Sequence, residues 1–583
     1  MKKIIKCLTS ILFISALMNT VFAQEALKSI EEDYYDFLGL NGITERPTLG
    51  YRTLSDNVWL FNEIESFEEN EDGTFTKVHI PGKESDGNVW KNNNLGTSWT
   101  IWQPSNPASN WFTRGIKQGL TVRVYGPECF NSYNSSTPYG QNDGGLWQGA
   151  GYNTALTAGL RIEGYGFELT FKPQLSWSQN KAFDINNNIY PNPYSYSFNS
   201  GTVNTPIDLV QRYGDSSFFN YDWGDSEIRW TWHSLTFGFG TQNPWLGPAY
   251  LNPMLGSNNA GGYLKFDIGL RKTKIIIPHF GWDLGYIEGR IWIGQLNESS
   301  YFDNNPANDK RMITGLSASY KPSFIPGFTI GLNRIFMNNW NPENIKYIFR
   351  LFTLSGSNGY LTGNDEDQKF SLFAEWNFSK IGFTVYGEYG CDDFSSDFTT
   401  NPFHTAIYTI GLKKTIPIKL KNAEDLQSEL IFEWNNFEMS QDFQLQWPYL
   451  GFYAHGALTQ GYTQNGQILG AGYCWAGNSQ LLQYKVYYKK GFTSLKILRY
   501  CPNNNSVLSQ AVNTASDATT GPVYTNWYAN YETYYSFGLE SLYYITNNFS
   551  LNGEINYVCI CNRNYTKYKL HNLSFQLELK YNF

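Results

Sequence analysis

The stretch LSFQLELKYNF, residues 573–583, alternates apolar and polar side chains without a break. The apolar positions are Leu573, Phe575, Leu577, Leu579, Tyr581 and Phe583. Because the side chains of a strand point alternately to its two faces, this pattern predicts a strand with one apolar face and one wet face. The segment is also about as long as a tilted strand must be to cross a bilayer.

The whole chain is polar on average and yet rich in aromatic residues. Its 583 residues include 17% aromatic and only 16% charged residues, and its mean hydropathy is -0.41. Outer-membrane barrels have such compositions, because lumenal polar residues alternate with lipid-facing apolar ones and aromatic residues gather at both membrane interfaces. A large secreted β-protein, such as a sandwich array or a propeller, fits the composition equally well. The net charge of -8 and the lack of a basic stripe argue against nucleic acid as a partner.

Residues 1–23 predict a cleaved secretory signal. They combine a basic start (Lys2, Lys3, Lys6), an apolar core (Ile11–Leu17) and an ending in Val21-Phe22-Ala23. This arrangement is typical of export signals and is too short for a membrane-spanning helix. Since no later run of about 18 apolar residues follows, a membrane-embedded form must be a closed barrel.

Residues 24–118 predict an N-terminal periplasmic segment of helical and irregular structure. A period of 3.6 residues over 24–45 indicates one helix, and Ser29 and Glu32 have the spacing of a capping box. The rest of this segment is irregular and contains an acidic stretch, EIESFEENED. We expect it to pack on the barrel mouth or to close it in part.

From about Gly119 onward, strand-like alternation recurs to the end of the chain. At roughly 26 residues for each strand with its share of loops, 119–583 predicts a closed antiparallel outer-membrane β-barrel of about 18 strands. The final strand should pair with the first. The long polar loops should be extracellular and the short turns periplasmic; these loops are 179–222, 338–367, 391–404 and 500–530.

Motifs for catalysis and metal binding are lacking in the sequence. The six histidines show no metal-ligand spacing, and neither a G-x-S-x-G motif nor a phosphate-binding loop occurs. The six cysteines after the signal are scattered, without the spacing of a metal site. We therefore expect no enzyme activity, no cofactor and no metal site, with an outer-membrane hydrolase as the remaining alternative.

Five segments, in the same order, resemble the capsule-assembly (Wzi-type) outer-membrane protein family. They are QGAGYNTALTAGLRIEGYGFELTFKPQLSWSQN (148–180), WTWHSLTFGFGTQNPWLGPAYLNPMLGSNNAGG (230–262), GRIWIGQLNESSYFD with SASYKPSFIPGFTIGLNRIF (289–303, 317–336), FTVYGEYGCDD with HTAIYTIGLKK (383–393, 404–414), and FYAHGALTQGYTQNGQILGAG (452–472). The chain departs from the family pattern at Leu246, where an aromatic residue is common, and at Gly262, where proline-glycine is common. The resemblance implies a barrel of about eighteen strands with a helical periplasmic element, and a surface lectin that helps to attach capsular polysaccharide.

The matched segments supply the candidate site residues, which are either polysaccharide contacts or parts of a lumenal polar network. They are Trp245, Asn258, Asn259, Arg290, Glu388, Asp392, Tyr453, His455, Tyr462 and Gln467. A wide polar lumen needs its charges paired, which favours the network for most of them. We expect Arg290 to pair with Glu388 or Asp392.

The favoured function is binding or anchoring of capsular or exopolysaccharide at the cell surface, and the alternative is a porin for small solutes. Four tryptophans crowd the central strands, and some of them should fill the interior: Trp230, Trp232, Trp282 and Trp292. The expected partners are outer-membrane lipid, a surface polysaccharide and, during biogenesis, the barrel-assembly machinery. We expect a monomer located in the outer membrane.

Overall fold

The computed structural model describes residues 28–69, 75–186, 192–199, 204–352, 366–393, 401–418, 426–447, 450–505, 507 and 531–583. The predicted signal, residues 1–23, lies outside these ranges. Among the described residues no helix is long and apolar enough to cross a membrane.

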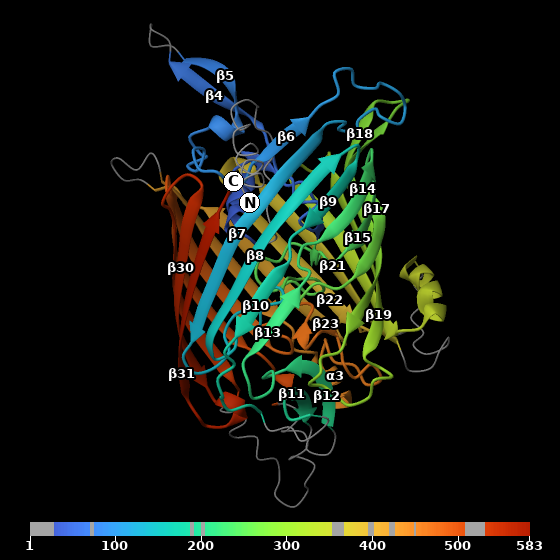
Figure 1. Ribbon diagram of the computed structural model, residues 1–583, viewed down its shortest axis with the longest axis vertical. Helices are drawn as coiled ribbons and strands as arrows, with labels where there is room; N and C mark the ends of the chain where they lie inside the picture. Colours follow the sequence, from blue (N-terminus) through green and yellow to red (C-terminus); the bar gives the residue numbers. More distant parts are fainter. Residues whose placement is uncertain are drawn as a thin grey trace, which may run out of the picture.

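One antiparallel sheet curls into a closed barrel (Figure 1). Its strands are β7 (Leu120–Asn134), β8 (Gly151–Gly164), β9 (Phe167–Phe171), β10 (Gln174–Ser178), β13 (Phe218–Asp222), β14 (Glu227–Trp232), β15 (Leu235–Gly240), β17 (Lys265–Ile277), β18 (Trp282–Asn297), β19 (Lys310–Pro322), β20 (Phe328–Asn339), β21 (Glu366–Phe378), β22 (Phe383–Asp392), β23 (Ala406–Thr415), β24 (Gln427–Asn436), β27 (Asn478–Tyr488), β28 (Gly491–Cys501), β29 (Thr533–Tyr544), β30 (Phe549–Cys561) and β31 (Leu570–Tyr581). In the described chain, β9 and β10 lie end to end along β8, and β14 and β13 lie end to end beside them, so the wall has 18 strands. The predicted fold class is confirmed.

The interruption between β9 and β10 falls at Pro173, which has no backbone N–H to donate to a ladder. Neighbouring β7 shifts register between Tyr125 and Glu128, where Pro127 lies. On the other side, residues 223–226 separate β13 from β14. These three irregularities, on either side of β8, therefore lie at about the same level of the wall.

The last strand closes the barrel, as predicted from residues 573–583. Strand β31 pairs with β7 from Ser574↔Asn134 to Lys580↔Glu128. Beyond this seam, β7 pairs with β6 (Ser98–Trp102), which comes from the N-terminal segment. Leu577 is 42% exposed on the outer face, whereas Ser574 is fully buried on the inner face.

The outer face of the wall is apolar and the inner face is polar. On β29, for example, Phe537 and Leu539 are exposed while Ser536 is buried. Of the four tryptophans on the central strands, only Trp292 is buried in the lumen. The other three, Trp230, Trp232 and Trp282, lie in aromatic groups on the outer face near one end of the barrel.

The two ends of the barrel differ in the length of their connections. At one end, here called the short-turn end, turns such as 165–166, 233–234 and 489–490 join the strands. At the opposite, long-loop end lie loops such as 135–150, 241–264 and 437–477. The smaller elements of this end are β11 (Ser195–Asn199), β12 (Asn204–Val210), β16 (Trp245–Leu246), η2 (Pro342–Phe352), α3 (Gln441–Gln446), β25 (Thr463–Gln464), β26 (Gln467–Ile468) and η5 (Arg563–Tyr565).

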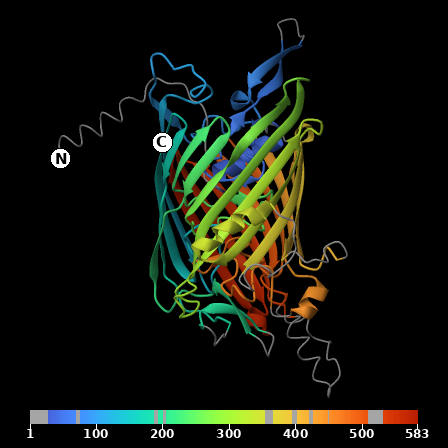
Figure 2. The same cartoon turned by 90° about the vertical axis from the view of Figure 1, so that its right-hand side faces the viewer.

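The N-terminal segment lies at the short-turn end, and its first part, which includes α2, enters the barrel (Figures 1 and 2). Its elements are α2 (Ile30–Leu40), β1 (Thr44–Glu45), β2 (Tyr51–Arg52), β3 (Leu60–Phe61), β4 (Glu63–Glu69), β5 (Phe75–Pro81), η1 (Gly82–Glu84) and β6. The η3 turn (Ser379–Ile381) of the wall lies at the same end. The β4–β5 hairpin projects beyond the barrel in both views.

Helix α2 confirms the predicted N-terminal helix, with shorter bounds than 24–45. The Ser29 side chain caps it by accepting a hydrogen bond from the Glu32 N–H at 3.1 Å. The helix stops at Leu40, because Gly42 adopts a positive φ of 74° that turns the chain away. Its apolar face packs with Trp90 against the barrel wall at Tyr487.

Candidate functional site

The lumen is packed by segments that enter from both ends and meet inside it. Residues 28–62 come from the short-turn end, and loops 241–264 and 437–477 come from the long-loop end. Strand β2 of the first segment pairs with β16 of the second. One buried apolar cluster contains residues of all three segments, so the described residues pack across the barrel.

Charged side chains fix α2 to the inner wall. Asp33 pairs with Lys485 of β27 at 3.0 Å, and Asp36 pairs with Lys413 of β23. Burial opposes ionisation of Asp33, but Lys28 and Lys485 outweigh it and hold the pKa of Asp33 below its usual range. The helix is therefore held by ionised carboxylates at both of these positions.

A network of arginines and carboxylates connects the wall to the segment inside it. The Asp267 carboxylate of β17 lies 2.6 Å from Arg229 and 2.7 Å from Arg290. Asp56, from the interior N-terminal segment, lies 3.1 Å from Arg290 and 2.7 Å from Arg271. Because these groups are largely removed from water, each charge depends on its partners.

Glycine allows this network to lie flat against the sheet. At Gly238 of β15, a Cβ atom would lie 2.3 Å from an Arg229 nitrogen and 2.5 Å from an Asp267 oxygen. The GFGTQN stretch that contains Gly238 (238–243) therefore serves close packing of side chains over a strand.

One carboxylate ties loop 241–264 to the wall. The Glu433 side chain of β24 accepts hydrogen bonds from three successive backbone N–H groups, those of Tyr250, Leu251 and Asn252, at 2.5–3.2 Å. A carboxylate held by several N–H groups is a strong anchor, since hydrogen bonds to an ionised acceptor are stronger than neutral ones.

A cavity of about 220 Å³, here called the mouth cavity, lies at the long-loop end. Its aromatic lining includes Trp147, Tyr196, Tyr473, Trp475, Tyr500 and Tyr565. Its polar lining includes Asn259, Gln467, Glu532 and Arg563. Arg563 donates to Glu532 at 2.6 Å and to the Tyr534 hydroxyl at 2.8 Å, which fixes its guanidinium at the cavity edge.

Four tyrosines form a stacked column beside the mouth cavity. The ring centroids are 5.7 Å apart for Tyr139 and Tyr473, 4.6 Å for Tyr473 and Tyr500, and 4.5 Å for Tyr500 and Tyr534. Tyr473 is half-buried, whereas the other three are buried. The column thus holds the Tyr473 ring between those of Tyr139 and Tyr500, while the residue as a whole stays partly exposed.

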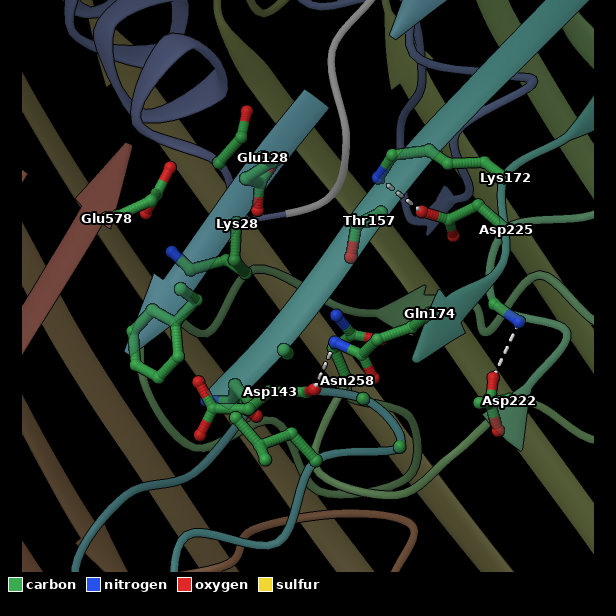
Figure 3. A pocket seen from close by; sticks show the side chains of 18 of the residues that line it. Lys28, Glu128, Asp143, Thr157, Lys172, Gln174, Asp222, Asp225, Asn258 and Glu578 are labelled. Carbon is green, nitrogen blue, oxygen red and sulfur yellow. Dashed lines mark hydrogen bonds and ion pairs between the residues drawn. The ribbon is translucent and has the colours of Figure 1, made fainter. Parts of the chain in front are cut away.

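A deeper cavity of about 270 Å³, here called the inner cavity, is shown in Figure 3. It shares Asp143 and Leu146 with the mouth cavity. Carboxylates outnumber amines in its lining: Glu128, Asp143, Asp222, Asp225, Glu540, Glu554 and Glu578 against Lys28 and Lys172. Of the two residues that line both cavities, Asp143 is the ionisable one. Burial raises the pKa of Asp143 to about 7, although Gln148 donates a hydrogen bond to it at 2.7 Å.

Three of the sequence-predicted residues lie buried inside the loop packing. The Trp245 indole N–H donates to the Ala249 carbonyl at 3.0 Å. The Tyr453 and Tyr462 hydroxyls donate to the carbonyls of Met254 and Leu255, at 2.7 and 2.6 Å. All three side chains are at most 1% exposed. The two tyrosines join the two loops, whereas the Trp245 bond lies within loop 241–264.

The predicted pairing of Arg290 with Glu388 or Asp392 is wrong. Arg290 pairs with Asp267 and Asp56, as described above. Asp392 instead accepts a hydrogen bond from Lys369 of β21 at 2.6 Å. Glu388 is 3% exposed and lies beside the backbone of loop 241–264. A Cβ atom added at Gly247 of that loop would be 3.0 Å from the Glu388 carboxylate.

Two predicted residues line the mouth cavity. Gln467 donates to the Asn259 carbonyl at 3.0 Å, and the Asn259 side chain donates to the Ile468 carbonyl at 2.9 Å. Asn258 lines the inner cavity instead. His455 lies apart from both cavities, with its Nε2 3.6 Å from Asp393.

The sequence prediction missed the tyrosine column and Arg563. Tyr139, Tyr473, Tyr500 and Tyr534 lie far apart in the chain, among the 42 tyrosines of the protein. Their only local signal is a position at the end of a strand or within a long loop. They come together because β28, which carries Tyr500, pairs with β29, which carries Tyr534, and because the loops that carry Tyr139 and Tyr473 pack beside these strands.

Comparisons with known proteins agree with this fold. The family model described as capsule assembly protein Wzi matches residues 135–536. Among solved structures, the chain is similar to Wzi of Escherichia coli, an outer-membrane protein involved in group 1 capsule assembly and a carbohydrate-binding β-barrel. The identity is 12%, the match covers 79% of this chain and 85% of that chain, and the TM-score is 0.51.

Two other barrels match more weakly. Pseudomonas putida OprB is 11% identical, over 79% of this chain and 94% of its own, with a TM-score of 0.35. Acinetobacter baumannii OccAB1 is 10% identical, over 79% of this chain and 96% of its own, with a TM-score of 0.36. No curated protein matches the sequence.

Proposed function

Because this chain belongs to the capsule assembly protein Wzi family, we propose that it binds a polysaccharide at the cell surface and anchors it to the outer membrane. The observation that carries the proposal is the mouth cavity, which presents aromatic and polar side chains at the long-loop end of a filled barrel. The carbohydrate binding of the E. coli protein of similar fold supports it.

The lining of the mouth cavity has the chemistry that sugars require. Aromatic rings make apolar contact with sugar rings, and amides and charged groups hydrogen-bond the hydroxyls. Tyr473 is half-buried and would contribute the edge of its ring, because Tyr139 and Tyr500 stack on its faces. Gln467 and Arg563 supply such groups beside the tyrosine column. A long repeating polymer offers many copies of its epitope, so weak binding at each cavity sums to a firm attachment.

The alternative function, a diffusion porin, is disfavoured by the packing of the lumen. A general porin of about 16–18 strands leaves an aqueous channel. In this protein, the described residues of segment 28–62 and of loops 241–264 and 437–477 share one buried cluster across the barrel. We therefore infer a closed barrel that presents a surface rather than a pore.

We further propose that binding occurs without catalysis or a cofactor. The two carboxylates among the described lining residues of the mouth cavity, Asp143 and Glu532, are each held by neighbours. Gln148 donates to the first, and Arg563 and Tyr534 donate to the second. The long-loop end faces outward, and the chain reaches the membrane through a secretory signal and the barrel-assembly machinery, as a monomer.

Two measurements on the purified protein test the proposed function together: single-channel conductance in planar bilayers and binding to the glycans of its own host. We expect no large, steady conductance and saturable binding to a surface polysaccharide. Large conductance without glycan binding would identify a porin and refute the proposal.

Tyr473→Ala is expected to weaken polysaccharide binding about tenfold, which corresponds to the loss of one aromatic contact of roughly 1–1.5 kcal/mol. Tyr568→Ala is the matched control, since Tyr568 is 55% exposed at the same end but lies outside the lining of the mouth cavity. Binding is measured by titration calorimetry or on a glycan surface. Equal losses in both variants would contradict the assignment of the site.

Binding is expected to weaken as the pH rises through about 7, the pKa to which burial raises Asp143. Below this pH the carboxyl is neutral, and above it a sugar that covers the site must also remove water from a charge, which costs free energy. Asp143→Asn should remove the dependence and bind at every pH as the wild type does at pH 5.5. An unchanged pH profile in this variant would show that another group titrates.

A further inference from the structure

The loop between β6 and β7, residues 103–119, folds over the outside of the barrel. The ring of Trp111 lies edge-on to that of Trp232, with centroids 4.6 Å apart, and Phe112 stacks on Trp230 at 6.3 Å. The Trp232 indole N–H donates to the Phe112 carbonyl at 3.2 Å. The loop is thereby fastened to the outer face of β14 at the short-turn end.

The face that the loop covers is continuous with the lipid-facing wall. Ile228, Trp230 and Trp232 alternate along β14 and so share one side of the sheet. Ile228 is 57% exposed, and Phe167 on the neighbouring β9 is 58% exposed. These residues belong to the apolar exterior, so loop 103–119 lies at the edge of the membrane rather than in the lumen.

The loop has a defined internal structure. The Asn110 side chain accepts hydrogen bonds from the N–H groups of Phe112 and Thr113, both at 3.0 Å. The Gln118 side chain exchanges hydrogen bonds with the backbone of Ala108 at 2.6 and 2.8 Å. Trp111 is thus held outward, 74% exposed, on an ordered turn.

Positive charge lies next to this exposed ring. Arg114 is exposed, and no ion pair joins it to another described residue. Lys117 is also exposed and is 3.8 Å from Glu163. An exposed tryptophan beside an unpaired arginine suits the boundary where acyl chains meet phosphate groups, because the indole prefers that interface and the guanidinium binds phosphate.

We propose that loop 103–119 is an interfacial binding site for anionic phospholipid, in which Trp111 enters the edge of the bilayer and Arg114 binds a lipid phosphate. Continuity with the lipid-facing wall favours lipid over a protein partner. This site is independent of the mouth cavity, which lies at the opposite end of the barrel. It would hold the first strand of the wall, and the N-terminal segment before it, against the membrane.

Photo-crosslinking from position 111 tests the lipid contact. A benzophenone amino acid is placed at position 111, at 228 on the wall as a positive control and at 568 on the long-loop end as a negative control. Each protein is reconstituted in vesicles of phosphatidylethanolamine and phosphatidylglycerol and irradiated. We expect lipid adducts at 111 and 228 and none at 568 by mass spectrometry.

Other labelling patterns would overturn the proposal. An adduct at 228 without one at 111 would place the loop outside the bilayer. A covalent dimer at 111 in place of the lipid adduct would show a protein interface. The heat-modifiable gel mobility of each protein reports on its correct folding, so a folding failure is distinguished from a negative result.

A second measurement addresses Arg114 by itself. Arg114→Gln should lower the affinity for phosphatidylglycerol about fivefold, as expected for one cation near an anionic lipid surface. Lys567→Gln removes an exposed charge from the opposite end and should leave the affinity unchanged. Retention of phospholipid by the detergent-purified proteins in native mass spectrometry gives both values. Equal retention by the Arg114→Gln variant and the wild type would refute the role of Arg114.

Discussion

Asp267→Asn is expected to lower the free energy of unfolding by roughly 3–5 kcal/mol, the cost of leaving a buried charge without its partner. The Asp267 carboxylate accepts hydrogen bonds from Arg229 at 2.6 and 2.9 Å and from Arg290 at 2.7 Å, and the residue is 1% exposed. Asparagine keeps the shape but removes the negative charge. Arg229 would keep Glu227 and Arg290 would keep Asp56, but the two guanidinium groups would repel each other in a buried site.

The matched control is Asp283→Asn at the short-turn end. Asp283 pairs with Lys274 at 3.0 Å, but both side chains are more than 40% exposed, at 42% and 45%. Exposed pairs of this kind contribute about 0–1 kcal/mol. Urea unfolding in detergent, followed by the shift in gel mobility between folded and unfolded protein, gives both values. Similar losses in the two variants would mean that the lumenal network does not stabilise the barrel.

Leu577→Arg is expected to cost roughly 2–4 kcal/mol if the site lies near the middle of the bilayer, because the new charge would face lipid. Gln576→Arg, one residue earlier on β31, places the same side chain in the inner cavity beside Glu554 and Glu578. There the charge finds carboxylates, and we expect a loss below about 1 kcal/mol.

Because both variants introduce arginine, the difference between them reports on whether the position faces the lipid or the lumen. Both substitutions lie on the closing strand, within the seam that runs from Ser574 to Lys580. The measurement is the amount of folded, heat-modifiable protein in the outer membrane, together with its unfolding in urea. A larger loss for Gln576→Arg than for Leu577→Arg would reverse the assigned faces of β31.

The wall of the barrel was predictable because each of its strands carries its own signal. Alternation over 573–583 predicted β31, its apolar outer face and its pairing with the first strand. The capping-box spacing at Ser29 and Glu32 predicted the start of α2. Local patterns of this kind are set by the period of the backbone and need no knowledge of neighbours.

The interior was not predictable in the same way. Arg290 pairs with Asp56, which lies 234 residues earlier in the chain, inside a segment expected to pack on the barrel mouth or to close it in part. The sequence shows that a lumenal arginine needs a carboxylate, but it does not show which one lies opposite. That choice depends on where the interior segment and the loops come to rest against the wall.

The candidate site, too, was predicted only in part from the sequence. The family resemblance pointed to Asn259 and Gln467, which line the mouth cavity, and also to Trp245 and Tyr453, which are buried in the packing of the loops. The tyrosine column arises from strand ends and loops that the sequence treats as unrelated. A cavity between such elements is a property of the assembled barrel.

The filled lumen also has a mechanical consequence. A pull on the proposed polysaccharide at Tyr473 would act on loop 437–477, which is bonded to loop 241–264 through Tyr453 and Tyr462. That second loop is fastened to β24 through Glu433.

The load continues beyond the loops, because β16 pairs with β2 and the interior segment is bound to Arg290 of β18 through Asp56. In a hollow barrel, tension on one loop would fall on the two strands that flank it. In this barrel the same tension is shared among strands on several sides of the wall. A larger pull is therefore needed before any single strand separates from its neighbours.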